Sequence, residues 1–474
     1  MQHDKLALLT DFYELTMMNG YLKEGMADRI AVFDVFFRTN QESSYCIAAG
    51  LEQAVEYLTQ LHFAEDEVEY LRSLGVFDEA FLQRLKEFRF TGDLYALPEG
   101  TVVFPGEPLL IVKAPIFQAQ LLESALLNIV NFQTLIATKA NRIVSAAAPG
   151  GVLEFGLRRA QAPDASVYGA RATVIGGCVS TSNVLACKMF GLPPKGTHAH
   201  SWIMSFPSEL EAFRSYARLY PEGCLLLVDT YNTLKSGMPN AITVFRELRE
   251  KGYEPLGIRL DSGDLAYLSK QARKMLDEAG FPNAKVFVSG DLDEYVISSL
   301  KAQGAQIDLY GVGTRMITSH SNPSLGGVYK IAAIQEGDVL VPKIKVSENP
   351  NKITNPGEKR LYRIYDKATG KAIADYLCLA GETIDESKPL TLVHPTERWK
   401  QMTVENYRAK ELYVQVLKGG NLVYKLPPLE EIRQSVRNNL AEFWEEYKRI
   451  ERPQLYKVDY SDQLYELKQK LLSR

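Results

Sequence analysis

The sequence predicts an α/β protein in which a (β/α) barrel is combined with a discontinuous α+β domain. A length of 474 residues exceeds one ordinary hydrophobic core and indicates two or three domains. Between about residues 150 and 335, short apolar runs alternate with amphipathic helical stretches. The segments before and after this region each contain few predicted strands. We therefore expect the two flanking segments to pack together as one domain.

The central region contains seven apolar runs, and the last four end at positions that are spaced as in βα units. Asp229, Asp261, Asp291 and Thr314 close these four runs. Six or seven consecutive βα units predict a barrel or a doubly wound sheet, and the lack of an early Gly-rich dinucleotide fingerprint favours the barrel. In both folds, ligands bind at the carboxyl ends of the strands. The runs are GVLEFGLRR, ATVIGGCVSTSN, PKGTHAHSW, CLLLVDTYNT, PLGIRLDSGDL, AKVFVSGDL and IDLYGVGT.

Changes in pattern along the chain predict four parts. Residues 117–147 carry little charge but are punctuated by Gln, Asn, Ser and Thr, which is typical of a buried helix. The predicted parts are residues 1–145, the N-terminal part of the discontinuous α+β domain; residues 146–335, the (β/α) barrel; residues 336–429, a β-rich part that packs with the N-terminal segment; and residues 430–474, a charged helical tail.

Composition narrows the classes of partner. With 54 basic and 58 acidic side chains, the net charge of −4 gives no electrostatic footprint for nucleic acid or an anionic membrane. No stretch reaches the length of a membrane span, and the first residues do not resemble a secretory leader. The five cysteines are scattered without a CxxC pair, which argues against a disulfide framework or a zinc knuckle. We therefore expect a cytoplasmic protein.

Three glycine turns at strand ends predict phosphate binding. A glycine lets the backbone approach an anion closely, and a small hydroxyl next to it can donate a hydrogen bond. Each turn by itself is also ordinary βα turn chemistry, but three on consecutive units favour a ligand site. The turns are Ser262-Gly263-Asp264, Ser289-Gly290-Asp291 and Gly311-Val312-Gly313-Thr314.

Carboxylates and arginines follow the same strands. Asp229 and Asp261 come after apolar runs, so each either caps the next helix or projects into the site, where it could bind ribose hydroxyls or the waters of Mg²⁺. Arg158 and Arg259 could bind a carboxylate or phosphate through two hydrogen bonds. Arg259 is the stronger candidate because its strand is otherwise apolar.

The motif GTHAHS places His198 and His200 one residue apart. On a strand, both side chains would point the same way and could hold a metal, as in barrel hydrolases. Such a site needs further ligands, and the only later histidines, His320 and His394, lie in predicted loops. A neutral imidazole beside bound phosphates could instead act as a nucleophile.

Seven motifs, taken in order, carry a resemblance to a known family. They are LLTDFYELTMMNGY, EFGLRRAQ, GGCVSTSNVLA, GTHAHSW, VDTYNT, RLDSGDL and GVGTRM followed by SLGGVYK. These residues resemble the nicotinate phosphoribosyltransferase family in its bacterial and animal forms, from about residue 8 to 335. The resemblance implies an irregular barrel of the type II phosphoribosyltransferase kind. It also implies conversion of nicotinate and phosphoribosyl pyrophosphate to nicotinate mononucleotide and pyrophosphate, coupled to ATP hydrolysis, in NAD biosynthesis.

The resemblance assigns catalytic roles to three of these residues. The second histidine of the motif is transiently phosphorylated in that family, and it corresponds to His200. Asp229 and Asp261 would lie near the pyridine ring or the ribose. Of the substrate contacts, Thr197 matches a nicotinate contact and Arg259 would bind the pyridine acid.

Further contacts follow from the same resemblance and from the related nicotinamide enzyme. Phe155 and Tyr13 would sandwich the pyridine ring, and Arg158 would lie near phosphate. Ser182 stands where the amide-using enzyme carries an aspartate, which fits an acid substrate because a hydroxyl can donate to a carboxylate that an aspartate would repel. The remaining contacts, to the phosphoribosyl group, are Ser289, Gly290, Asp291, Gly313 and Thr314.

The cofactor and partner expectations depend on the resemblance. No GxxxxGK[ST] sequence is present, so the use of ATP and Mg²⁺ follows from the family alone, and we predict no metal ligands in the protein. The resemblance also implies a homodimer in which Tyr13 comes from the neighbouring subunit.

Three other functions remain open at this point. A quinolinate-type phosphoribosyltransferase has a similar layout, but such enzymes are shorter and lack the histidine motif. A metal-dependent barrel hydrolase would use His198 and His200 as ligands. A non-catalytic phosphosugar-binding regulator would keep the glycine turns but would have no use for His200.

Overall fold

The computed structural model, which describes residues 6–38 and 44–473, divides into two units. Unit 1 comprises Met1–Thr138 and Ser324–Arg474, and unit 2 comprises Lys139–Pro323. The long helix α6, Glu123–Ala147, forms where the sequence predicts a buried helix, and its residues from Lys139 onward belong to unit 2.

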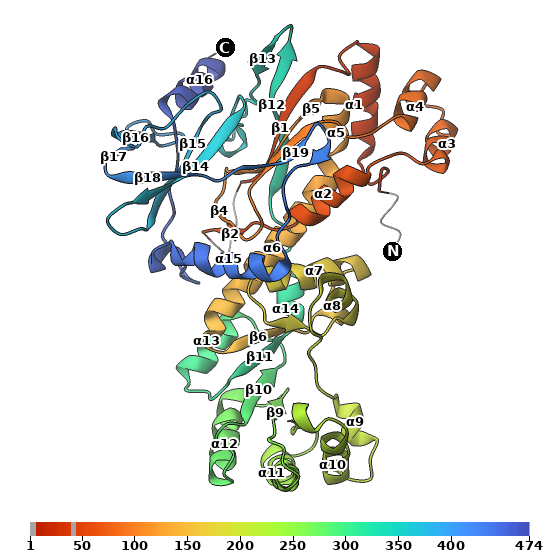
Figure 1. Cartoon of the computed structure of the whole chain (residues 1–474), viewed down its shortest axis with the longest axis vertical. Coiled ribbons are helices and arrows are strands. Elements are labelled where there is room, and N and C mark those ends of the chain that lie inside the picture. The colour runs from red at the N-terminus through yellow and green to blue at the C-terminus, as the bar shows by residue number, and fades with distance from the viewer. Residues whose placement is uncertain (1–5, 39–43, 474) are drawn as a thin grey trace. The chain divides into compact units, whose positions relative to one another are not determined.

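Unit 2 is built on a parallel sheet with the order β7-β6-β11-β10-β9-β8. Figure 1 shows the inner strands side by side. The outer strands β7 and β8 lie at the two ends of the strand order, so closure into a barrel remains a prediction. The strands are β6, Gly151–Glu154; β7, Ser180–Thr181; β8, Leu225–Leu227; β9, Gly257–Leu260; β10, Lys285–Ser289; and β11, Leu309–Val312.

Helices follow the strands of unit 2, and four of the eight α-helices α7–α14 begin at a polar side-chain cap. The side chains of Asn183, Ser208, Asp264 and Asp293 each accept a hydrogen bond from a backbone N–H in the first turn. Asp261 therefore does not cap the helix that follows it, because Asp264 does. The helices are α7, Pro163–Ile175; α8, Val184–Phe190; α9, His200–Met204; α10, Glu209–Leu219; α11, Met238–Glu250; α12, Leu265–Glu278; α13, Glu294–Ala302; and α14, Thr314–Ile317.

Two of the predicted strands are wrong. The run ATVIGG lies at the end of α7, and only the two residues of β7 that follow it pair with the sheet. Residues 166–175 of α7 are all buried, so the helix shows no polar face and its apolar run cannot be told from a strand by periodicity. In PKGTHAHSW, residues 192–199 have no regular structure and His200 is the first residue of α9.

Unit 1 is held together by strands from both of its chain segments. Its seven-stranded sheet has the order β13-β12-β1-β5-β3-β19-β20, in which β1 pairs with β12 and β3 pairs with β19, all antiparallel. Main-chain hydrogen bonds thus join the chain segment that precedes unit 2 in the sequence to the segment that follows it. The strands are β1, Ile30–Phe37; β3, Asp93–Ala96; β5, Pro108–Pro115; β12, Gly327–Glu336; β13, Val339–Pro342; β19, Val414–Lys418; and β20, Asn421–Leu422.

A six-stranded sheet with the order β17-β16-β21-β15-β14-β18 and the short pair β2 and β4 complete the strands of unit 1. Strands β14 and β15 form the hairpin predicted at ATGK. The bounds are β2, Cys46–Ile47; β4, Val102–Val103; β14, Lys359–Asp366; β15, Ala372–Leu379; β16, Leu390–Val393; β17, Gln401–Val404; β18, Tyr407–Glu411; and β21, Val458–Tyr460.

The C-terminal tail is not wholly helical as predicted. Between α15 and α16, strand β21 inserts between β15 and β16, because its buried Asp459 and Tyr460 fit the inner positions of that sheet. The helices of unit 1 are α1, Phe12–Lys23; α2, Leu51–Gln60; α3, Glu65–Ser73; α4, Glu79–Lys86; α5, Ile116–Leu121; α15, Leu429–Ala441; and α16, Asp462–Leu472.

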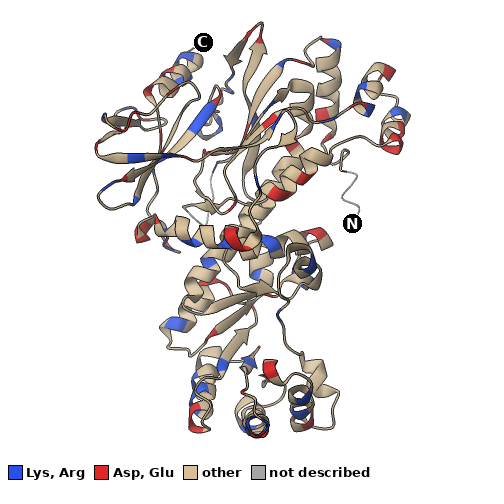
Figure 2. Ribbon diagram, viewed as in Figure 1, with Lys and Arg blue, Asp and Glu red and all other residues tan. Residues whose placement is uncertain are grey.

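Surface charge follows the even balance of the sequence. Figure 2 shows acidic and basic residues interspersed on the outer helices of each unit. The five cysteines all lie among the described residues, where they are buried and not joined by disulfides. Within residues 6–38 and 44–473, no helix has the length and apolar character required to cross a bilayer.

Gly237 tests how closely helix α11 packs against the strand that leads to Asp229. A Cβ at Gly237 would overlap the carbonyl oxygen of Val228, whereas one at Gly223 would meet no atom within 4 Å. We expect Gly237→Ala to lower the free energy of unfolding by about 1–3 kcal/mol, since overpacking forces the backbone to move. Urea unfolding measures the change, and Gly223→Ala is the control. Equal stability of the two variants would contradict this packing.

Candidate functional site

The guanidinium of Arg259 links four segments at the carboxyl edge of the unit 2 sheet. Its Nε donates to Ser289 Oγ at 2.8 Å, and its Nη1 donates to Thr197 Oγ1 at 3.0 Å. Its Nη2 donates to Asp261 Oδ1 at 2.8 Å. The guanidinium carbon lies 5.4 Å from the centre of the Phe155 ring. Five of the residues predicted from sequence therefore meet at one side chain.

Asp261 is held as an anion within this cluster. Burial raises its pKa, but the Ser289 hydroxyl and the Arg259 guanidinium outweigh burial and leave the pKa below its usual value. Ser289 Oγ donates to the same carboxylate oxygen that Arg259 binds. The carboxylate is therefore ionised at neutral pH and fixed in direction.

His200 lies next to this carboxylate at the start of α9. Its Nδ1 is 3.1 Å from Thr230 Oγ1, and its Nε2 is 3.8 Å from Asp261 Oδ2. The side chain is 39% exposed, so a ligand can reach the imidazole. Thr230 belongs to the VDTYNT motif, but nothing in the spacing of that motif predicts that its side chain faces His200.

Asp229 supports the turn that carries Asp261. Its Oδ2 accepts hydrogen bonds from the backbone N–H of Asp261 at 2.8 Å and from Ser262 Oγ at 2.7 Å. Its Oδ1 is buried and has no hydrogen-bond partner among the described residues. A buried, unpartnered carboxylate oxygen is costly unless a ligand or cation satisfies it. Asp229 thus has one oxygen used by the fold and one available to a ligand.

The turn Ser289-Gly290-Asp291 takes an unusual backbone path. Gly290 has φ of +103°, and a Cβ there would come within 2.6 Å of the Asp261 carbonyl oxygen. Asp291 has φ of +42°, which is uncommon for a residue other than glycine. The absence of a side chain at Gly290 brings this turn against the loop after β9.

Gly311 in β11 and Gly313 directly after it make room for Phe155. A Cβ at Gly311 would lie 2.8 Å from the Phe155 ring, and one at Gly313 would lie 3.1 Å from the Phe155 carbonyl oxygen. The Phe155 ring packs edge-on against Phe287, with ring centres 5.7 Å apart. Thr314 follows as the first residue of α14. The third glycine turn therefore leaves room for the Phe155 ring to pack between Phe287 and Arg259.

Glu154, which no sequence motif predicts as a site residue, is a buried carboxylate next to Phe155 in the chain. Glu154, at the end of β6, accepts hydrogen bonds from Gly156 N and Thr181 Oγ1, and its own carbonyl oxygen accepts from Ser182 N at 3.0 Å. Burial raises its pKa above the usual value. Glu154 thus joins the turn after Phe155 to the segment that carries Ser182.

Two predicted site residues make none of the hydrogen bonds described above. Arg158 is exposed, in the short 3-10 helix Leu157–Arg159 that follows β6. Tyr13 belongs to unit 1, on α1, where its side chain is 45% exposed.

His198 and His200 do not point the same way, because they do not lie on a strand. His198 is buried, its Nε2 accepts a hydrogen bond from Leu227 N at 3.2 Å, and its ring packs edge-on against Tyr216. His198 therefore attaches the segment before α9 to strand β8. In the part of the chain that the structure describes, no group of three or more His, Cys, Asp or Glu side chains could hold a metal ion.

Comparison with known proteins gives consistent matches along the chain. Models of the nicotinate phosphoribosyltransferase N-terminal domain, family and C-terminal domain match residues 8–131, 151–367 and 358–468. A nicotinate phosphoribosyltransferase of Bacillus subtilis is 47% identical over 460 residues, which cover 97% of this chain and 94% of the relative.

Solved structures agree. The crystal structure of human nicotinic acid phosphoribosyltransferase is similar with a TM-score of 0.87 and 32% identity, covering 98% of this chain and 100% of the human chain. The nicotinate-nucleotide pyrophosphorylase from Pyrococcus furiosus is similar in fold alone, with a TM-score of 0.71 and 22% identity over 94% of this chain and 97% of that one.

The burial of His198 predicts a pH dependence of stability. Burial lowers its pKa from 6.5 to about 4. In the unfolded chain the imidazole takes up a proton below about pH 6.5, whereas in the folded protein it does so only near pH 4. The contribution of His198 to stability is therefore complete above pH 6.5 and is lost as the pH falls through this window.

A His198→Gln variant tests this dependence, because its amide oxygen can still accept from Leu227 N. Its stability should fall less steeply with acidification than that of the unaltered protein. Urea unfolding at several pH values measures the slopes, and His320→Gln, at an exposed histidine of the same unit, is the control. Parallel slopes for the His198 variant and the unaltered protein would refute the assignment.

Proposed function

The chain belongs to the nicotinate phosphoribosyltransferase family, and from this premise we propose that it converts nicotinate and phosphoribosyl pyrophosphate to nicotinate mononucleotide and pyrophosphate, coupled to ATP hydrolysis. The observation that carries the proposal is the position of Arg259, whose guanidinium bonds Thr197, Ser289 and Asp261 at the carboxyl edge of the parallel sheet. This arrangement supplies a cation for an acid substrate next to a turn suited to phosphate.

The pyridine end of the site would be formed by Arg259, Thr197 and Phe155. Thr197 Oγ1 accepts a hydrogen bond from the guanidinium and donates one to the carbonyl oxygen of His198, so the positions of both groups are fixed before a carboxylate binds. The Phe155 ring lies beside the guanidinium and offers a face for the pyridine. Ser182 would add a hydroxyl donor to nicotinate, and Tyr13 of a second subunit would cover the other ring face in a homodimer.

The phosphoribosyl end would use the two glycine turns. Ser289, Gly290 and Asp291 would contact the ribose and its phosphate, and Gly313 and Thr314 would contact the phosphate from the neighbouring loop. Arg158, exposed after β6, is available to a phosphate group. Fixed donors and cations at this edge would stabilise the departing pyrophosphate while the ring nitrogen of nicotinate attacks the anomeric carbon.

Mg²⁺ fits the carboxylates of this edge. In phosphate-transferring sites Mg²⁺ keeps several waters and is bound by one or two carboxylates together with substrate phosphates. Asp229 has a buried oxygen without a partner and Asp261 is ionised, so these two residues would hold the hydrated ion through its water molecules. When bound, the ion would neutralise charge on the pyrophosphate.

His200 would be the site of ATP coupling. Thr230 contacts Nδ1, which leaves Nε2 as the nitrogen with no closer contact than the carboxylate 3.8 Å away. Transfer of the γ-phosphoryl group from ATP to this nitrogen would form a phosphohistidine and release ADP, and later hydrolysis would release phosphate.

The central experiment incubates the purified protein with nicotinate, phosphoribosyl pyrophosphate and Mg²⁺, with and without ATP. We expect nicotinate mononucleotide in both reactions, more of it with ATP, and an acid-labile phosphoprotein only with ATP. Absence of nicotinate mononucleotide under both conditions would overturn the proposed function.

His200→Ala separates the energy coupling from the transfer reaction. We expect ATP hydrolysis to fall to background while slow ATP-independent transfer remains, since His200 is not the group that attacks ribose. The measurement is the release of ADP and of nicotinate mononucleotide in the same reaction. If the variant still hydrolysed ATP in step with product, the assignment to His200 would be wrong.

Ser182→Asp tests the charge argument for substrate choice. A carboxylate at this position should lower kcat/KM for nicotinate relative to nicotinamide by at least about tenfold, because it would face the carboxylate of the substrate. Ser182→Asn, which adds similar bulk without charge, is the matched control. Unchanged selectivity in the aspartate variant would count against this role.

A further inference from the structure

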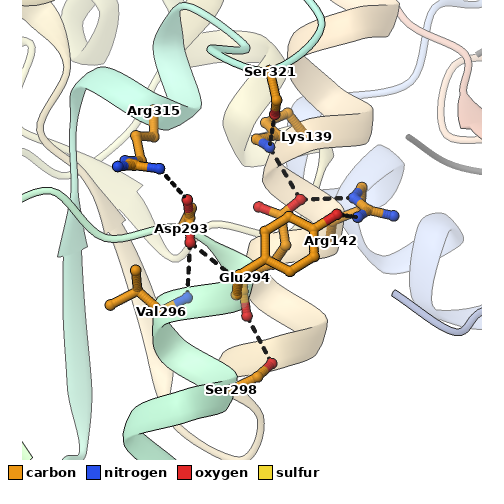
Figure 3. A network of polar contacts seen from close by, with 9 residues as sticks. Lys139, Arg142, Asp293, Glu294, Val296, Ser298, Arg315 and Ser321 are labelled. Atoms are coloured by element: carbon orange, nitrogen blue, oxygen red, sulfur yellow. Dashed lines mark hydrogen bonds and ion pairs between the residues drawn. The ribbon is translucent and has the colours of Figure 1, made fainter. Parts of the chain in front are cut away.

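Two loops of the site are joined by an ion pair that the proposed reaction does not use. Asp293 follows the turn after β10, and Arg315 follows the turn after β11, and these two strands are parallel neighbours. Arg315 Nη1 donates to Asp293 Oδ2 at 2.7 Å, as Figure 3 shows. The ion pair therefore connects the segment that follows one glycine turn to the segment that follows the other.

Asp293 has both carboxylate oxygens engaged. Its Oδ1 accepts from the backbone N–H groups of Tyr295 at 3.1 Å and Val296 at 2.8 Å, which caps helix α13. Its side chain is 7% exposed, whereas that of Arg315 is 39% exposed. A nearly buried carboxylate with fixed donors on one side defines the position of the cation that binds its other oxygen.

Helix α13 is itself anchored, so it can serve as the reference for both loops. Glu294 Oε1 accepts from Lys139 Nζ at 3.0 Å and from Arg142 Nε at 2.8 Å, both on α6 (Figure 3). The three side chains are at most 3% exposed. Breaking such a buried ionic group by removing one partner is strongly destabilising. These contacts therefore hold the start of α13 against α6.

The turn before Asp293 needs such support. Gly290 and Asp291 take positive φ values in succession, +103° and +42°. A non-glycine residue in this region persists where the surrounding structure holds it. Ser289 is tied to Arg259 and Asp261 on one side of the turn, and Asp293 fixes the other side. In the loop after β11, Met316 and Ile317 are fully buried, and Arg315, which precedes them, connects this loop to the turn after β10.

We propose that Asp293 and Arg315 are positioning residues, which hold the turns Ser289-Gly290-Asp291 and Gly313-Thr314 at the separation that the phosphoribosyl group requires. This inference rests on the proposed function. The pair should affect the binding of phosphoribosyl pyrophosphate, because the turns that it joins would contact the phosphoribosyl group. It should have little effect on the binding of nicotinate, which would bind at Arg259 and Phe155.

Asp293→Asn and Arg315→Met test the inference. Asparagine keeps an acceptor for the cap of α13 but removes the charge that binds Arg315, and Arg315→Met leaves the cap intact. Each variant should weaken binding of phosphoribosyl pyrophosphate with Mg²⁺ about tenfold in calorimetry and raise its KM by a similar factor. The KM for nicotinate should stay within about twofold.

The double variant should be no worse than either single variant, since the two residues act as one unit. Arg315→Lys, which keeps the charge, should recover most of the affinity. The control is Arg214→Met, which breaks the exposed 2.6 Å ion pair with Glu247 between α10 and α11. If the variants lose stability but keep their affinity and KM for phosphoribosyl pyrophosphate, the pair has only a structural role and the inference is wrong.

The outcomes separate the inference from the proposed function. If the unaltered protein binds phosphoribosyl pyrophosphate and the variants bind it more weakly, the inference stands even if no nicotinate mononucleotide forms. Unaltered binding in Asp293→Asn and Arg315→Met overturns the inference while the proposed function remains. An unaltered protein that does not bind phosphoribosyl pyrophosphate overturns both.

Discussion

The site of unit 2 depends on one partly buried cation, the guanidinium of Arg259. Its side chain is 13% exposed, so its donors must be satisfied by the protein or by a ligand. A guanidinium has a rigid, planar set of donors, and each acceptor that binds it is therefore fixed in direction. Asp261 supplies the compensating charge, and Thr197 and Ser289 supply neutral oxygens. A lysine could not orient three loops in this way.

The loops around Arg259 are joined to one another as well as to the cation. Asp229 accepts from the backbone of Asp261, which connects the segment after β8 with the turn after β9. Ser289 donates to the Asp261 carboxylate and so connects the turns after β9 and β10. The ion pair of Asp293 and Arg315 connects the segment after β10 with the segment after β11. Connecting loops at a sheet edge are otherwise the most mobile part of such a fold. Side-chain bonds between neighbouring loops fix their donors before a ligand arrives, and such preorganisation makes electrostatic stabilisation effective.

Much of the fold could be predicted from local pattern, and the failures have physical causes. Strands β1 and β9 are visible in the sequence as short, mostly apolar runs, and the amphipathic helices α10 and α11 show apolar residues three and four positions apart. Helix α7 was mistaken for a strand because it is buried on all sides. Strand β21 was missed because three residues that enter a sheet between β15 and β16 carry almost no local signal. Pairing of this kind is decided by distant partners.

For the site, the sequence by itself determined the chemical groups, because Arg259, Asp261, Ser289, Thr197 and His200 all come from motifs visible in the chain. Asp261 and Ser289 lie at strand ends as predicted, whereas Thr197 and His200 do not follow a strand. Only the tertiary structure decided which groups meet. In the folded chain His198 is buried against β8, and Thr230 contacts His200. Glu154 bonds the segment of Ser182, and Asp293 bonds Arg315 of the next loop. The reason is that a motif specifies which side chains a turn carries, whereas contacts between turns depend on strand order, register and burial, which involve residues far apart in the chain.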